Sequence, residues 1–102
     1  MITVKPTGTI LFEVILHDAE RVEILGDFTD WGRSPIQMER RSDGVWSSAL
    51  SIAPGVHHFR YRIDGWRWIT DFAAHGVSRN EFGDWNSRLC VALAHAERRR
   101  AA

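Results

Sequence analysis

The chain has 102 residues, a length that suits one domain with a single hydrophobic core. Its 13 basic and 13 acidic residues balance, so no net basic face indicates a nucleic-acid partner. No apolar run reaches the ~18 residues of a membrane helix, and the N-terminal residues lack the apolar core of a signal peptide. One cysteine cannot form an intrachain disulfide, so we expect core packing to hold the fold and the cytoplasm to be the compartment.

A period of two, in which apolar and polar residues alternate, runs through most of the chain. In chain order it predicts strands over residues 9–16, 20–26, 36–40, 45–52, 56–63, 66–69 and 87–93. Turn residues separate these segments, and the Asp-Gly pairs at 43–44 and 64–65 are strong hairpin signals. Short strands at this spacing predict an all-β fold, an immunoglobulin-like antiparallel β-sandwich.

The strand expected over 56–63 has two different faces. Its odd positions from Phe59 to Ile63 are aromatic or aliphatic, whereas Arg60 and Arg62 occupy the even positions. Because side chains alternate across a strand, we expect the first set to fill the core and the arginines to stand on an exterior sheet face.

Five tryptophans are many for a chain of this size. The alternation around Trp46 predicts that it is buried. Trp31 follows a turn, and Trp66 and Trp68 share one parity, so both of these can face the same way. A glucose ring can stack its C–H face on an indole while arginine and amide groups bind its hydroxyls, and neither contact requires net charge. This composition therefore predicts a carbohydrate site.

Residues 70–86 follow neither the helical nor the strand period, so we expect a long functional loop. The aromatic residues Phe82 and Trp85 argue against disorder, and Trp85 is open to a surface or a packing role. The arginine-rich residues 94–102 are predicted to be a short polar tail, which leaves a folded domain over residues 1–93.

Metal binding and catalysis find less support in the sequence. His57 and His58 are neighbours on a strand and are expected to point to opposite faces, so no metal or cofactor is predicted. Cys90 lies in the last strand and is expected to be buried and inert. Glycoside hydrolysis needs two carboxylates facing one bond, and turn or capping roles account for Asp64 and Asp71. We therefore predict no catalytic residue and no enzyme activity.

Four segments in one order carry a resemblance to a known family. They are VEILGDFTDW (22–31), PGVHHFRYRIDG (54–65), WITD (68–71) and NEFGDWNS (80–87). This order resembles the family-48 carbohydrate-binding modules. That family includes the glycogen-binding domain of the AMP-activated protein kinase beta subunit, the N-terminal early-set domains of isoamylases and branching enzymes, and short stand-alone bacterial early-set proteins. The resemblance covers roughly residues 9–93.

The resemblance implies a non-catalytic module that recognises α-1,4-glucan, such as glycogen, starch or maltooligosaccharides. By position it implies a stacking indole at Trp31, a basic donor at Arg60, a ring-inserting side chain at Phe82 and a hydroxyl-binding amide at Asn86. The turn after Asp64 is one residue longer than the family's. Counting back from the next aspartate puts the second stacking indole at Trp68, and Trp66 stays a candidate.

Two kinds of partner follow from this interpretation. The first is an α-glucan polysaccharide, and neither a nucleic acid nor a membrane is expected. The alternative is a domain of the same fold without sugar binding of its own, which would act as a protein-interaction or accessory domain for a glycogen-metabolising enzyme.

Overall fold

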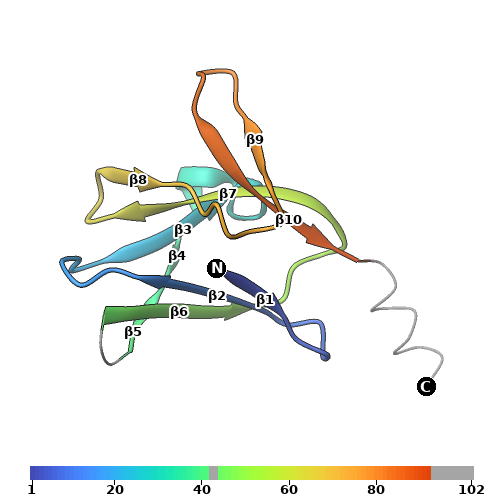
Figure 1. The fold of residues 1–102 in the computed structure, drawn as a ribbon, viewed down its shortest axis with the longest axis horizontal. Coiled ribbons are helices and arrows are strands. Elements are labelled where there is room, and N and C mark those ends of the chain that lie inside the picture. The colour runs from blue at the N-terminus through green and yellow to red at the C-terminus, as the bar shows by residue number, and fades with distance from the viewer. Residues whose placement is uncertain (42–43, 93–102) are drawn as a thin grey trace.

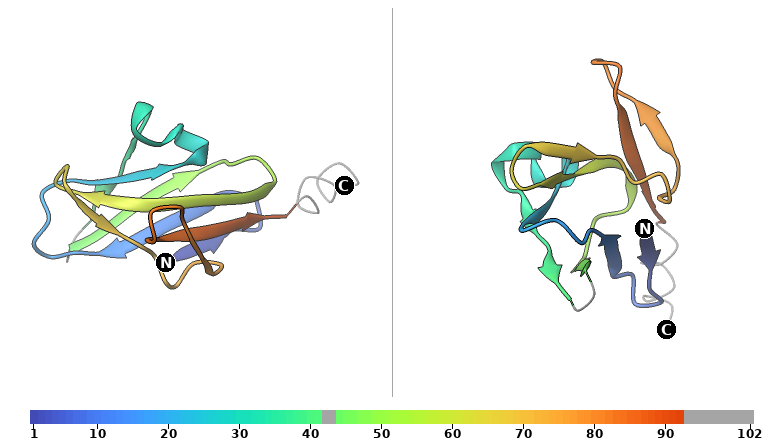
Figure 2. Two further views of the ribbon diagram at one scale, coloured as in Figure 1. Left: turned by 90° about the horizontal axis from the view of Figure 1, so that it is seen from above. Right: turned by 60° about the vertical axis from the view of Figure 1, so that its left-hand side comes forward.

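The computed structural model describes residues 1–41 and 44–92, and the tail predicted at 94–102 lies outside them. Two antiparallel sheets face each other (Figures 1 and 2). The first has the order β1 (Ile2–Val4), β2 (Ile10–Ile15), β6 (Val45–Leu50) and β5 (Glu39–Arg40). The second has the order β4 (Ile36–Gln37), β3 (Val22–Gly26), β7 (Gly55–Ile63), β10 (Trp85–Val91) and β9 (Val77–Arg79), and β8 (Arg67–Ile69) also pairs with β7. The predicted immunoglobulin-like antiparallel β-sandwich is confirmed.

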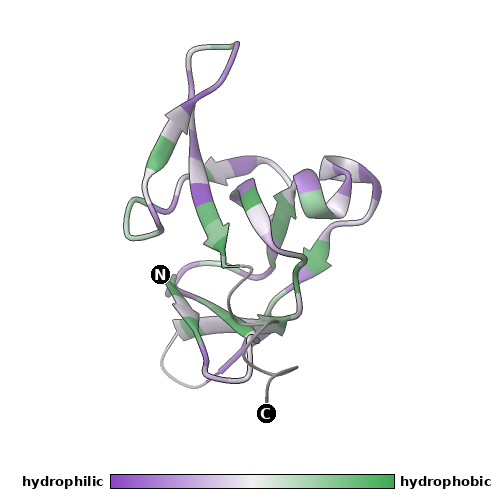
Figure 3. Ribbon diagram, turned by 90° about the vertical axis from the view of Figure 1, so that its right-hand side faces the viewer, coloured by the Kyte–Doolittle hydropathy of each residue, from purple (hydrophilic) through white to green (hydrophobic). Residues whose placement is uncertain are grey.

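The core lies between the two sheets, and Figure 3 shows hydrophobic residues recurring along the strands of both layers. The rings of Phe12 on β2 and Phe59 on β7 are fully buried and meet edge to face at 5.2 Å. Tyr61 contacts Phe59 from the same face of β7. Trp46 is buried as predicted, and its indole nitrogen donates to the carbonyl of Leu16 at 3.1 Å. Most of the core therefore comes from the predicted strand faces, and Ile2 on β1 joins it from outside the predicted strands.

One predicted strand, 36–40, is divided between the two sheets. Its first part, β4, pairs with β3, and its second part, β5, pairs with β6. Met38 lies between the two parts and is buried in the core. The alternation predicts that residues are extended, but it contains no information about which neighbour a strand pairs with. The short strands β1 and β9 were not predicted, and β9 lies within the segment 70–86 that we expected to be a loop.

Strand β7 determines where a site can form. One edge of β7 pairs with β3, while its other edge is shared between β10, along 55–59, and β8, along 61–63. β10 pairs with β7 only from Ser87 onward. Its first residues, Trp85 to Ser87, pair instead with the preceding strand β9, and the resulting hairpin stands above the sandwich in Figure 1. The hairpin therefore forms a wall beside the outer face of β7.

Two short 3₁₀ turns follow β3, namely η1 (Asp27–Thr29) and η2 (Trp31–Arg33). Across the described ranges 1–41 and 44–92, the structure has no helix of the length and hydrophobicity that a membrane span requires.

Candidate functional site

The turn after β3 positions the first candidate indole. Gly26 packs so closely against β7 that an added Cβ would lie 2.5 Å from the carbonyl oxygen of His58, so only glycine fits there. The hydroxyl of Thr29 accepts the N–H of Gly26 and lies 3.0 Å from the carbonyl oxygen of Trp31. Trp31 itself has a left-handed backbone with φ of 51°. A bulky residue in this conformation costs conformational energy, and the buried Thr29 contacts hold the turn that presents it.

The outer face of β7 carries two arginines with different partners. Arg62 donates to both carboxylate oxygens of Glu23, at 3.0 and 3.2 Å, and Glu23 is only 3% exposed. Within residues 1–41 and 44–92, no carboxylate forms an ion pair with Arg60, and its buried Nε has no hydrogen-bond partner. The guanidinium of Arg60 lies over the Trp68 ring, 5.3 Å from its centroid. Arg60 is thus available to donate to a ligand, whereas Arg62 is occupied by a buried ion pair.

Strand β8 brings the second indole to the same place. Trp68 lies opposite Arg62 in the β7–β8 ladder, so it shares the outer face with both arginines. The indole is 41% exposed, and Arg62 also approaches its ring, at 5.8 Å. Register with β7 therefore aligns this ring beside the unpaired guanidinium of Arg60.

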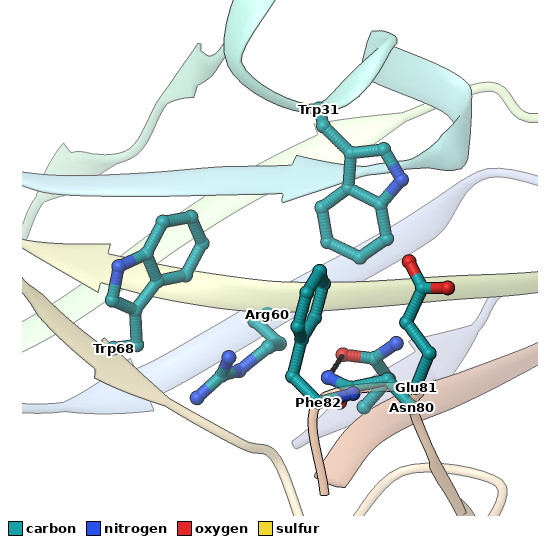
Figure 4. Close-up of a pocket in the computed structure, with 7 residues that line it drawn as sticks. Trp31, Arg60, Trp68, Asn80, Glu81 and Phe82 are labelled. Atoms are coloured by element: carbon teal, nitrogen blue, oxygen red, sulfur yellow. Dashed lines mark hydrogen bonds between the residues drawn. The ribbon is translucent and has the colours of Figure 1, made fainter. Parts of the chain in front are cut away.

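These side chains surround an open pocket of about 400 Å³, a volume in the range of small-ligand sites. Its lining consists of Trp31, Arg60, Trp68, Asn80, Glu81, Phe82 and Asn86. In Figure 4, Trp31 lies above Phe82 and Trp68 lies to its left, and the guanidinium of Arg60 lies between Trp68 and Phe82. Aromatic faces, one guanidinium, amides and one carboxylate thus converge on one cavity.

The structure brings five of the six predicted site residues together, and the exception is Trp66. Trp66 is at the tip of the β7–β8 turn, 74% exposed, and it is not part of the pocket lining. Trp31 and Phe82 are 36% and 83% exposed, so their rings are open to a ligand.

Trp85, whose role the sequence left open, faces away from the pocket. It neighbours Asn86 on β10, so the two side chains lie on opposite faces of the strand, and Asn86 is the one in the lining. Arg79 on β9 stacks on the Trp85 ring at 5.6 Å. The exposed indole of Trp85 therefore belongs to the other face of the hairpin.

Two lining residues, Asn80 and Glu81, were not among the predicted site residues. Both lie in the tight loop between β9 and β10. Their only signal in the sequence is their position beside Phe82 in the NEFGDWNS segment. A contribution from Glu81 to the pocket depends on how the hairpin stands relative to the sandwich, which local patterns do not contain.

Cys90 is exposed, so the prediction of burial is wrong: it lies at an outward position of β10 and pairs with Val56, which is also exposed. His57 and His58 both reach the carboxylate of Asp27, at 3.1 and 3.6 Å. Among residues 1–41 and 44–92, no three His, Cys, Asp or Glu side chains are arranged to hold a metal ion.

The fold and the pocket together define a class: a small β-sandwich with an aromatic-lined surface site. The family model described as the glycogen recognition site of AMP-activated protein kinase matches residues 14–95, which is most of the chain. The protein therefore belongs to this family of glycogen-binding carbohydrate-binding modules, and the resemblance seen in the sequence is confirmed.

Relatives of the chain include enzymes of α-glucan metabolism. It is 26% identical over 87 residues to the chloroplastic phosphoglucan phosphatase LSF1 of Arabidopsis thaliana, covering 84% of this chain and 14% of that protein. It is 41% identical over 58 residues to the 1,4-alpha-glucan branching enzyme GlgB of Nitrosomonas eutropha, covering 56% of this chain and 8% of the enzyme.

A solved structure supports the fold. A Salmonella typhimurium protein described as an alpha-amylase aligns with a TM-score of 0.59 at 14% identity, over 80% of this chain and 13% of that one. The chain thus spans about one seventh or less of each of these proteins, and they are similar to it only through this region.

Proposed function

We propose that this protein is a non-catalytic module that binds α-1,4-glucan in the pocket between Trp31, Trp68 and Phe82. The observation that carries the proposal is the convergence of three exposed aromatic rings around a guanidinium without an ionic partner in the described part of the chain. Apolar sugar faces stack on such rings, and the hydroxyls between them need directional donors and acceptors.

The polar groups of the pocket suit a neutral ligand. Arg60 supplies donors, Glu81 supplies acceptors, and their opposite charges offset each other. One or two stacked rings with a few polar contacts give a binding free energy of about 4–7 kcal/mol, which corresponds to dissociation constants between about 1 mM and 10 µM. Maltooligosaccharides long enough to reach both indoles should bind more tightly than glucose.

The same lining argues against hydrolysis at this site. Its acidic side chain is Glu81, while Asp64, Asp71 and Asp84 do not line the pocket. Glycoside hydrolases use a facing pair of carboxylates. We therefore expect no release of reducing sugar from starch, and we assign the activities of the relatives to the parts of those proteins that this chain does not cover.

The test compares tryptophans inside and outside the pocket. Trp31→Ala and Trp68→Ala should each weaken maltoheptaose binding by about tenfold or more, because each removes a stacking platform. Trp66→Ala is the matched control, since it removes an exposed indole that does not line the pocket. Co-sedimentation with glycogen and fluorescence titration provide the measurements. Unchanged binding by both pocket variants, or equal loss in the control, would refute the proposal.

A second candidate function is that of an accessory domain for a glycogen-metabolising enzyme. The observation in its favour is an apolar surface on the first sheet, where Ile15 is 65% exposed and lies beside Met1 and Val45. Such a patch suits a protein contact. If the protein fails to sediment with glycogen but forms a complex with a branching enzyme that Ile15→Lys abolishes, this second function replaces the first.

A further inference from the structure

Asn80 holds the loop at the tip of the β9–β10 hairpin. Its side-chain oxygen accepts the backbone N–H groups of Phe82 and Asp84, at 3.0 and 3.1 Å. Its own backbone N–H donates to the carbonyl of Asp84 at 2.8 Å, and its carbonyl accepts the N–H of Gly83 at 3.1 Å. Of the two ends of a side-chain amide, the oxygen accepts hydrogen bonds and the nitrogen only donates them. The two backbone donors therefore determine which way the Asn80 amide is turned.

This orientation directs the nitrogen of Asn80 toward Asn86. The Asn80 Nδ2 lies 3.3 Å from the Asn86 Oδ1, a contact drawn as a dashed line in Figure 4. Because Nδ2 can only donate, the atom of Asn86 that faces it must be the oxygen. The orientation of Asn86 thus follows from backbone hydrogen bonds several residues away, and its Nδ2 is left on the other side of the amide. Asn86 lines the pocket, so this amide is available to a ligand.

We propose that Asn80 is a positioning residue that fixes the hydrogen-bond polarity of Asn86, so that the pocket meets its ligand with the amide nitrogen as a donor. Together with the guanidinium of Arg60, this donor makes the floor of the site a recognition surface for ligand oxygens that accept hydrogen bonds, such as sugar hydroxyl oxygens. Glu81 supplies the acceptor at the hairpin tip. This inference rests on the proposed function, because the polarity of Asn86 matters for binding only if a sugar occupies the pocket.

The substitution Asn80→Asp isolates this role. A carboxylate keeps acceptors for the N–H groups of Phe82 and Asp84 but cannot donate to Asn86. The Asn86 amide then turns its nitrogen to the new carboxylate and its oxygen to the pocket. Combining the change with Asp84→Asn restores the charge of the loop, since Asp84 is exposed and does not line the pocket. Asp84→Asn alone is the control for the second substitution.

Two readouts decide the outcome. In the double variant, the side-chain amide resonances of Asn86 should move downfield by nuclear magnetic resonance, because they gain a charged acceptor. Maltoheptaose affinity should fall about tenfold while the melting temperature stays unchanged. Asn80→Ala, which removes the loop contacts as well, should lower both the affinity and the melting temperature.

The outcomes separate this inference from the proposed function. If the Asn86 amide resonances do not move in the double variant, Asn80 does not orient Asn86 and the inference is overturned. If they move but affinity matches that of the wild type, the polarity of Asn86 has no part in recognition, which overturns it as well. If the unmodified protein does not bind maltoheptaose, the proposed function fails, and the role in recognition fails with it.

Discussion

Asp64 is an exposed aspartate, and one of its two carboxylate oxygens joins two turns. Its Oδ1 accepts the backbone N–H groups of Glu20 and Arg21, both at 2.8 Å, and its own backbone is left-handed with φ of 53°. These hydrogen bonds, first that from Arg21 and then that from Glu20, lower the pKa of Asp64 below its ordinary value. The turn between β7 and β8, which leads to Trp68, is therefore fixed to the turn before β3 by one side chain.

We predict that Asp64→Asn lowers the melting temperature at pH 7. Asparagine tolerates the left-handed backbone, but its neutral oxygen accepts the two N–H groups less strongly. Because the folded pKa lies below the unfolded value, the wild-type advantage is complete above the unfolded pKa and is lost as the pH falls through the folded one. Thermal unfolding of both proteins across acid pH measures this. The two melting temperatures should converge below the ordinary carboxyl pKa of 3.8; a constant difference would contradict the prediction.

At the scale of secondary-structure elements, a buried network joins β7 to β10. The Tyr61 hydroxyl donates to the carboxylate of Asp71 at 2.8 Å, and the backbone N–H of Asp71 donates to the Ser87 hydroxyl at 2.7 Å. Burial, and then the adjacent Asp71 charge, raise the pKa of Tyr61 far above its ordinary value, so the phenol keeps its proton. The segment after β8 is thereby tied to both strands just below the point where the hairpin leaves the sheet.

We predict that Tyr61→Phe lowers the free energy of unfolding by about 1–3 kcal/mol, because a buried carboxylate loses a donor. Urea unfolding at pH 7 measures the change. Maltoheptaose affinity below the unfolding transition should stay the same, since Tyr61 faces the core and the pocket lies on the opposite face of β7. An unchanged urea midpoint would show that water or another group replaces the lost hydroxyl.

At the scale of the whole molecule, one sheet both builds the core and lines the candidate site. Phe59 and Arg60 are neighbours on β7, yet Phe59 is fully buried between the sheets and Arg60 lines the pocket. In the β3–β7 ladder, Phe59 lies opposite Gly26 and Arg60 lies opposite Leu25. Leu25 is only 1% exposed although it lies on the outer face, apart from the inter-sheet core. Side chains therefore cover this face of the sheet closely as well.

We predict that substitutions at these two neighbouring positions have opposite effects. Phe59→Leu should lower the free energy of unfolding by about 1–3 kcal/mol and leave maltoheptaose affinity unchanged, because it empties part of the core. Arg60→Ala should lower affinity about tenfold and change the free energy of unfolding by less than about 1 kcal/mol. Urea unfolding and calorimetric titration of both variants provide the comparison. Parallel losses of stability and affinity in either variant would contradict it.

Much of this arrangement could be predicted from the sequence, because it depends on local rules. Alternation along 56–63 determined that Phe59 and Ile63 face the core and that Arg60 and Arg62 face outward. The order of four segments was enough to identify the family.

Other features were decided only by the tertiary structure. Alternation places Arg60 and Arg62 on the same face and does not distinguish them, and only the resemblance pointed to Arg60. The structure supplies the physical reason: Glu23 on β3, nearly forty residues before Arg62, lies opposite Arg62 and pairs with it, so Arg60 is the arginine without an ionic partner in the described part of the chain. Trp68 rather than Trp66 joins the pocket because it pairs with β7, whereas Trp66 lies in the turn.

Contacts between distant segments also decided two further features. They divided residues 36–40 between the two sheets, and they brought Asn80 to the pocket. A period of two specifies which face of a strand a side chain takes. The identity and register of the neighbouring strand come from contacts between segments far apart in the chain, and those contacts selected the residues that meet in the pocket.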